Sequence, residues 1–356
     1  MLFDLHPKQN REELFGRDYE IEYVINQILS GNWVIIGGQR EIGKTSLMKV
    51  VINELRKKYG FKGIYVSLRG VRSLNSLLNL IILELNKSKT QINLRVSINF
   101  VVGSAGIELK RNAKAANSLI ELFNSIQEDF VIGIDEVQEI SKASRQFLDV
   151  LGNVFSTNPK IKFIFTGSYV GVTKTLINPS ASSPLHGRPP TLLNLKPFNE
   201  KLSKGFLRKG MEELNVSFDK EDEVVKKLDG IVGWLTLFGN FYAIRRMDFK
   251  EALNLTLEEG KKIMIEEFNH FLESKTNKQL YLTVMETLKF VNRWKDIKRG
   301  VEIKMGKVDD KELSLALDAL INSNFVTKGE RREYTITDPI LKEIDFEKLS
   351  SRNTFI

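Results

Sequence analysis

The sequence predicts an α/β protein: a parallel sheet with helices on both faces, then a helical region and a C-terminal winged helix. Three observations predict this order. Short β-rich runs alternate with helical patterns over about the first two hundred residues, which is typical of a parallel sheet flanked by helices. After Pro197 the strand-like runs stop and helical periodicity continues alone. The last part shows three helices and then two short strands around a charged turn, which indicates a winged helix.

A chain of 356 residues is long enough for two or three domains, and we expect three. The expected bounds are 1–198 for the α/β domain, 199–274 for a helical lid and 275–356 for the winged helix. Within the first domain, an inserted β-hairpin is expected near 94–110, where apolar and polar residues alternate around two glycines.

Five strand candidates are nearly continuous apolar runs, as expected when helices cover both faces of a sheet. They are residues 33–36, 63–67, 130–134, 161–166 and 191–195. Helices are expected over 46–57 and 74–86. The longest apolar passage, 230–244, is interrupted by polar residues and glycines. It therefore predicts a buried helix and not a membrane span.

Composition excludes several chemistries. The chain has no cysteine, which excludes disulfides, thiolate nucleophiles and cysteine-based zinc sites, and its three histidines lack metal-ligand spacing. The N-terminus has no basic segment followed by an apolar one, so we expect a cytoplasmic protein without a secretory signal or membrane contact. The net charge of +8 fits either attraction to a polyanion or a lysine-rich surface of the thermophile type.

The segment 38–45 matches the phosphate-binding P-loop pattern G-x-x-x-x-G-K-[ST] in full. In order the residues are Gly38, Gln39, Arg40, Glu41, Ile42, Gly43, Lys44 and Thr45, with Ser46 next in the helix. The glycines let the loop curl so that backbone N–H groups surround phosphate oxygens, and the following helix adds positive potential. Lys44 is expected to reach the β- and γ-phosphates, and the Thr45 hydroxyl to ligate magnesium.

An acidic pair follows another apolar strand and completes a metal site. Asp135 and Glu136 end the run 130–134, so they should lie at the carboxyl edge of the sheet, where the P-loop also lies. We expect Asp135 to hold magnesium, directly or through water. Glu136 is the expected general base that polarises the attacking water.

Two further positions are candidates for sensing or stabilising the γ-phosphate. Ser168, with Thr166 as second choice, follows the strand 161–166 and could sense loss of the phosphate; a simple capped turn is the alternative. Arg188, on a proline-rich loop before the last strand, could stabilise transition-state charge. Its alternative is a surface arginine in a turn.

Taken together, these residues resemble the archaeal AAA+ ATPases of the STAND-like group, which are relatives of the origin-recognition ATPases. The resemblance covers almost the whole chain. Phe15 and Arg17, in the segment 15–20, look like the family's box before the P-loop that packs on the adenine. Residues 185–188 look like its L-x-G-R segment, and 229–235 like its lid turn. The segment 334–339 looks like the closing strand of its winged helix.

The sequence departs from the family at three positions. Gln39 and Glu41 replace a proline and an arginine in the P-loop, outside the groups that touch phosphate, and Val232 replaces the lid proline. The resemblance implies ATP or ADP as the nucleotide, and the absence of a guanine-reading N-K-x-D motif agrees with it. It also leaves open an oligomer in which Arg188 acts on its own nucleotide or on a neighbour's.

The C-terminal domain carries a basic stretch, 289–311, that could face the phosphates of duplex DNA. Its basic residues are Lys289, Arg293, Lys295, Lys298, Arg299, Lys304, Lys307 and Lys311. The presumed recognition helix, 311–322, is poor in side chains that read bases. The alternative is therefore a domain that packs on the ATPase core.

The sequence thus predicts magnesium-dependent ATP binding and hydrolysis that drives a conformational switch on an unidentified protein client. Two alternatives remain open at this point. One is a signalling switch that holds ADP and turns over slowly, and the other is a DNA-binding protein gated by ATP through its winged helix.

Overall fold

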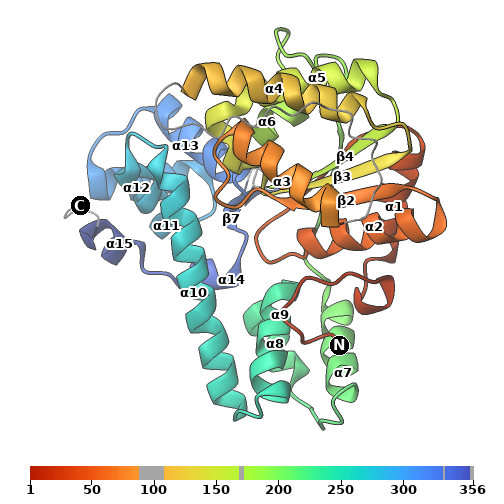
Figure 1. Cartoon of the computed structure of the whole chain (residues 1–356). Helices are drawn as coiled ribbons and strands as arrows, with labels where there is room; N and C mark the ends of the chain where they lie inside the picture. The colour runs from red at the N-terminus through yellow and green to blue at the C-terminus, as the bar shows by residue number, and fades with distance from the viewer. Residues whose placement is uncertain (88–107, 168–171, 332, 353–356) are drawn as a thin grey trace. The chain divides into compact units, whose positions relative to one another are not determined.

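The computed structural model describes residues 1–87, 108–167, 172–331 and 333–352 (Figure 1). The chain divides into two compact units. The sheet unit comprises Pro7–Gly38 and Gly43–Leu195, and the helical unit comprises Met1–His6, Gln39–Ile42 and Lys196–Ile356. The expected hairpin near 94–110 lies almost wholly outside the described residues, and its last three positions begin a helix. The expected domain bounds remain a prediction.

The sheet unit contains five parallel strands, which confirms the predicted fold class. They are β1 (Val34–Gly37), β2 (Lys62–Ser67), β3 (Phe130–Asp135), β4 (Ile161–Thr166) and β5 (Thr191–Asn194). Their spatial order is β2-β3-β4-β1-β5, and every neighbouring pair is parallel. The residues that follow the strands therefore meet at one edge of the sheet.

Helices cover both faces of this sheet (Figure 1). The helical segments of this unit are η1 (Arg11–Glu13), α1 (Asp18–Leu29), α2 (Lys44–Lys58), α3 (Leu74–Lys87), α4 (Glu108–Asn124), η2 (Val137–Ala143), α5 (Ser144–Thr157) and α6 (Val172–Ile177). Buried side chains of α3, α4 and α5 form one core with Ile132 and Phe163 of the sheet. On the other face α2 lies so close to β3 that a Cβ at Gly133 would come within 2.7 Å of Met48 and Ile52.

The prediction that all five strands are buried on both faces is wrong for β5. Its side chains alternate between half-buried and exposed, and Leu192 is 41% exposed. The reason is the strand order: β5 is an edge strand, paired only with β1, whereas β3 lies between two strands and is buried throughout. An apolar run alone does not distinguish these two positions.

The helical unit begins with a bundle and ends with the predicted winged helix. The bundle holds α7 (Glu200–Glu212), α8 (Glu221–Leu228), α9 (Val232–Gly239), the π-helix η3 (Asn240–Ile244) and the long α10 (Phe249–Glu273). The winged helix holds α11 (Lys278–Thr287), α12 (Trp294–Met305), α13 (Asp310–Asn322), β6 (Val326–Lys328), β7 (Tyr334–Ile336), α14 (Pro339–Lys342) and α15 (Phe346–Arg352). An isolated antiparallel bridge joins Arg293, which precedes α12, to Glu333, which precedes β7.

The first residues of the chain pack inside the bundle. Phe3 is fully buried, and a Cβ at Gly210 of α7 or Gly239 of α9 would lie 2.3 Å from its ring. Asn240 donates to the Phe3 carbonyl at 3.0 Å. The two glycines therefore create the space that this aromatic ring fills.

The apolar passage 230–244 is helical, as predicted. It forms α9 and η3, and its large side chains Trp234, Phe238 and Phe241 are buried. In the part of the chain that the structure describes, no helix combines the length and the apolar character needed to cross a membrane.

Candidate active site

The loop between β1 and α2 has the curled backbone that a phosphate cradle needs. Three residues adopt positive φ: Gly38 at 133°, Glu41 at 58° and Gly43 at 94°. The glycines reach these conformations without steric cost because they have no Cβ. Among the described residues, no side chain caps the N-terminus of α2. The start of a helix carries positive potential, which attracts an anion.

Three side chains of the P-loop and the following helix make contacts that hold the loop in place. The Lys44 ammonium donates to the Gly38 carbonyl at 3.1 Å, which holds it across the loop. Ile42 is fully buried and anchors the loop. The Ser46 hydroxyl accepts the Lys8 backbone N–H at 3.1 Å, so it holds the N-terminal segment against α2.

Asp135 is the centre of a hydroxyl cluster at the carboxyl edge of the sheet. Its carboxylate is 5% exposed and accepts three hydrogen bonds. Oδ2 accepts from the Thr45 hydroxyl at 2.9 Å and from the Tyr65 hydroxyl at 2.7 Å, and Oδ1 accepts from the Thr166 hydroxyl. The structure therefore brings the two predicted magnesium-binding residues, Thr45 and Asp135, into direct contact.

Glu136 follows in a left-handed conformation, with φ at 57°. Its backbone N–H donates to the Thr166 hydroxyl at 3.3 Å, and its Oε2 accepts from the Gln138 amide at 2.5 Å. The side chain is half-buried at the same edge as the P-loop. A carboxylate in this position can accept a proton from a water that approaches the phosphate.

Thr166, the second choice for a phosphate sensor, is fully buried. Its hydroxyl donates to Asp135 and accepts from the Glu136 backbone, so its bonds are directed to the acidic pair. Ser168, the first choice, lies outside the described residues.

Arg188 lies at the amino ends of the parallel strands, whereas Asp135 lies at their carboxyl ends. Its guanidinium donates to the Ser156 hydroxyl at 3.0 Å and lies 5.4 Å from the Phe155 ring centroid. Phe155 in turn packs on Trp33, which immediately precedes β1, and Arg188 itself precedes β5. Because the strands are parallel, residues before them lie at the amino edge. The structure does not bring Arg188 to the phosphate site of its own chain.

Residues 39–42, the middle of the P-loop, pack with the helical unit and are part of it. Arg40 forms an ion pair with Glu267 of α10. The Glu41 carbonyl accepts the Gly233 N–H, at the start of α9, at 2.8 Å. Gln39 is half-buried beside them. The sequence did not predict these contacts, since they join residues about two hundred positions apart.

Phe15 and Arg17 lie immediately before α1. Arg17 is the N-cap of α1, is 6% exposed and pairs with Glu20 at 2.7 Å. Phe15 is half-buried. A contact of either residue with adenine remains a prediction.

Tyr65 is a site residue that the sequence analysis missed. It lies on β2, and burial together with the Asp135 carboxylate raises the pKa of its phenol well above the ordinary value, so the phenol stays a hydrogen-bond donor. The sequence offered one indication of this role: Tyr65 is a tyrosine in an otherwise apolar stretch of the strand that precedes the acidic strand.

The donor set at Asp135 fits magnesium. A hydroxyl and a carboxylate are hard oxygen ligands, and Mg²⁺ usually takes one or two of them together with phosphate oxygens and water. Within the described ranges, no group of three or more acidic or histidine side chains could hold a metal by itself.

Comparison with known families and structures agrees with this geometry. Residues 14–238 match the family model of an ATPase domain predominantly from Archaea, and residues 275–337 match the C-terminal winged helix-turn-helix domain of MCM proteins. The chain is similar to the solved Walker-type ATPase of Pyrococcus abyssi, with 26% identity, a TM-score of 0.78 and coverage of 96% of this chain and 99% of the other.

More distant structures share the fold. The ORC2 protein of Aeropyrum pernix, solved as ADPNP–ADP complexes, is 15% identical with a TM-score of 0.66, and the match covers 98% of this chain and 95% of that one. The CDC6P protein of Pyrobaculum aerophilum is 13% identical with a TM-score of 0.52, covering 98% and 97%. No curated protein matches the sequence.

The ATPase family model covers well over half of the chain and contains the P-loop, the hydroxyl cluster and all but the last residue of α9. The C-terminal winged helix follows it, as in the structure. The chain therefore belongs to the ATPase domain family found predominantly in Archaea, and it is a P-loop enzyme that binds and hydrolyses ATP.

Proposed function

We propose that this ATPase works with magnesium and uses its nucleotide to drive a conformational switch. Two places in the molecule support the proposal. The hydroxyl cluster around Asp135 supports the metal. The hydrogen bond between Glu41 of the P-loop and Gly233 of α9 is the observation that carries the switch.

The chain's own residues divide the chemistry among them. Magnesium, when bound with ATP, neutralises charge that develops on the phosphates, and Thr45 and Asp135 would hold it. Lys44 would exchange its 3.1 Å bond to the Gly38 carbonyl for phosphate oxygens. Glu136 would accept a proton as water attacks the γ-phosphorus and ADP leaves.

The switch would act through two consecutive residues of α9. Gly233 donates its N–H to the P-loop carbonyl of Glu41, and the next residue, Trp234, donates its indole N–H to Asp338 of the winged helix at 2.9 Å. Arg40 adds an ion pair to Glu267 of α10. A change in the loop when the γ-phosphate is lost would therefore alter bonds that fix α9.

The chemical part is tested by two substitutions. Glu136→Gln should retain Mg·ATP binding but lose turnover by roughly a hundredfold or more, as expected when a general base is removed. Lys44→Ala should lose Mg·ATP binding itself. Isothermal titration and phosphate release measure both quantities. Unchanged Mg·ATP affinity in Lys44→Ala would contradict the assignment of the site.

The switch is tested by the emission of Trp234. The chain has three tryptophans, so Trp33→Phe with Trp294→Phe leaves Trp234 alone as the reporter. We expect its emission to differ between the Mg·ATP and Mg·ADP complexes, because its indole is bonded to the winged helix. Identical spectra in all nucleotide states would refute the switch. If the purified protein retains ADP and hydrolyses ATP negligibly, the result would favour the alternative of a signalling switch that holds ADP and turns over slowly.

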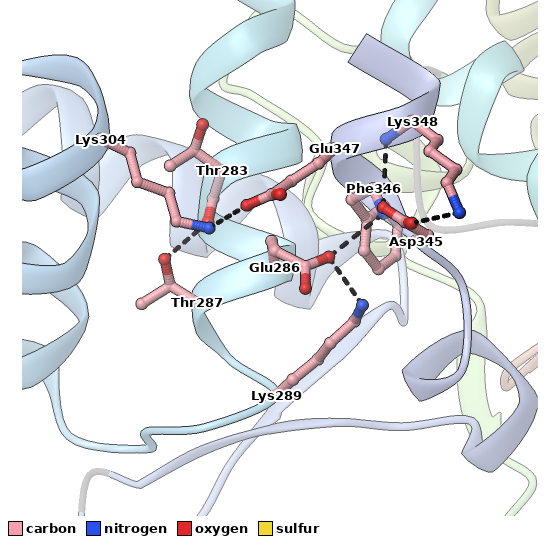
Figure 2. Close-up of polar contacts among 9 residues, drawn as sticks. All are labelled: Thr283, Glu286, Thr287, Lys289, Lys304, Asp345, Phe346, Glu347 and Lys348. Carbon is pink, nitrogen blue, oxygen red and sulfur yellow. Dashed lines mark hydrogen bonds and ion pairs between the residues drawn. The ribbon is translucent and has the colours of Figure 1, made fainter. Parts of the chain in front are cut away.

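The winged helix favours a second candidate function, DNA binding. Of the eight basic residues in 289–311, three are neutralised: Lys289 by Glu286, Lys304 by Glu347 (Figure 2), and Lys298 by Glu302 and Asp310. The other five are exposed and form no ion pair with any described residue: Arg293, Lys295, Arg299, Lys307 and Lys311. Such unpaired cations are available to phosphates.

The cations suggest which helix would contact DNA. Lys295 and Arg299 lie one turn apart on α12 and share its exposed face. The presumed recognition helix α13 instead exposes three acidic side chains, at positions 310, 312 and 318. We therefore place the DNA contact on α12.

A matched pair of double variants tests DNA binding. Lys295→Ala with Arg299→Ala should lower the affinity for duplex DNA and reduce the slope of log affinity against log salt by about two. Lys226→Ala with Lys250→Ala removes the same charge from exposed positions of the bundle and should change neither. Absent binding, or equal loss in both variants, would leave the winged helix as a domain that packs on the ATPase core.

A further inference from the structure

Tyr65 occupies a defined position beside the metal-binding residues. It lies on β2 in register with Gly133 of β3, two residues before Asp135. Residues 65, 133 and 135 therefore share one face of the sheet, the face that α2 covers. Because Gly133 has no side chain, α2 approaches closely, and Lys49 of α2 lies 4.2 Å from the centroid of the Tyr65 ring.

The Tyr65 hydroxyl and the Thr45 hydroxyl converge on one oxygen of Asp135. The distances to Oδ2 are 2.7 Å from Tyr65 and 2.9 Å from Thr45, while Thr166 occupies Oδ1. An ionised carboxylate has about four lone-pair sites. With three of them occupied, the carboxylate cannot rotate without breaking a hydrogen bond, and one site remains to face the metal or its water.

We propose that Tyr65 is a positioning residue for the metal: its hydroxyl fixes the Asp135 carboxylate against Thr45 and so sets the affinity of the nucleotide site for a divalent cation. This inference rests on the magnesium-dependent function proposed above. Tyr65 acts through Asp135 and touches neither the metal nor the nucleotide. Outer partners of this kind commonly change metal affinity by one or two orders of magnitude.

The test measures metal binding directly, with Mn²⁺ as a paramagnetic probe. Tyr65→Phe removes the hydroxyl and keeps the ring. In the ADP complex we expect its Mn²⁺ affinity, measured by electron paramagnetic resonance, to fall roughly tenfold. ADP affinity in EDTA should not change, and turnover should recover at high magnesium. Tyr59→Phe, at an exposed position that ends α2, is the matched control and should behave as the parent protein.

A double-mutant cycle separates positioning from a general structural effect. In an Asp135→Asn background, Tyr65→Phe should cause little further loss of Mn²⁺ affinity, because the residue through which it acts is already altered. Fully additive losses, or parental Mn²⁺ affinity in Tyr65→Phe, would overturn the inference and leave the ATPase assignment intact. If the parent protein bound no Mn²⁺ with nucleotide, both this inference and the magnesium-dependent function would fall.

Discussion

Two buried aspartates, Asp135 and Asp338, show how differently one residue type is used in the two units. Both are at most 5% exposed. Asp338 accepts backbone N–H groups from the first turn of its own helix, α14, and one indole N–H from Trp234. Asp135 accepts side-chain hydroxyls from three separate elements, α2, β2 and β4. A carboxylate bonded mainly to its own helix is a cap, whereas one that gathers hydroxyls from distant elements forms a site.

The largest expected effect concerns Asp135. Asp135→Ala should reduce ATP turnover by roughly a hundredfold, since it removes a metal ligand and the acceptor of three hydrogen bonds. Steady-state phosphate release measures this. Asp149→Ala, at an exposed position of α5, should be neutral. Equal losses in the two variants would mean that Asp135 has no special place in the reaction.

Asp338 should instead affect stability. Asp338→Ala removes the cap of α14 and leaves the Trp234 indole N–H buried without its acceptor. The expected cost is about 2–3 kcal/mol in the free energy of unfolding. Urea unfolding measures it, with Asp318→Ala on the exposed face of α13 as the control. If Asp338→Ala also abolished ATP turnover in folded protein, the contrast between cap and site would fail.

Gly233→Ala tests whether the contact between α9 and the P-loop affects ATP binding. A Cβ at this position would lie 2.5 Å from the Glu41 carboxylate and 2.8 Å from its carbonyl. The Cβ would also lie 2.6 Å from the Glu41 Cβ, so the P-loop backbone and α9 must move apart, and the strain should lower stability by more than the helix propensity of alanine restores. We expect roughly a fivefold change in ATP affinity. Gly329→Ala, where a Cβ would meet nothing nearer than 3.8 Å, should leave it unchanged; the same must hold for Gly233→Ala if the loop and α9 are independent.

The smallest effect is a pH dependence at Asp338. Burial raises the pKa of its carboxyl, although the Trp234 N–H and the backbone N–H groups oppose this shift. A carboxyl with a raised pKa in the folded state contributes stability below its unfolded pKa, and that contribution is lost as the pH rises through the folded pKa. The parent protein should therefore gain stability relative to Asp338→Asn as the pH falls from neutral towards 4. A difference independent of pH would show that Asp338 does not titrate in this way.

The fold and the phosphate site were largely predictable from the sequence because they depend on local patterns. Apolar runs located the strands to within two residues, and the P-loop motif places Lys44 and Thr45 at a helix start in any such context. The acidic pair followed from strand direction. These features need no knowledge of which strands are neighbours.

The remaining features depend on tertiary arrangement. Tyr65 reaches Asp135 only because β2 pairs with β3 in one register, which no local pattern specifies. The contact between Glu41 and Gly233 joins two distant segments in the same way. The position of Arg188, by contrast, could have been deduced: a residue that precedes a parallel strand lies at the amino edge, away from the phosphates.

The buried ring of Phe3 makes the helical bundle sensitive to the very beginning of the polypeptide. A Phe3→Ala chain would contain a hollow about the size of a benzene molecule, lined in part by Gly210 and Gly239. Benzene added to the solution could refill that hollow and restore cohesion between α7 and α9. The packing between α7 and α9 thus depends on the ring of Phe3, and a small aromatic ligand could restore that packing in the Phe3→Ala variant.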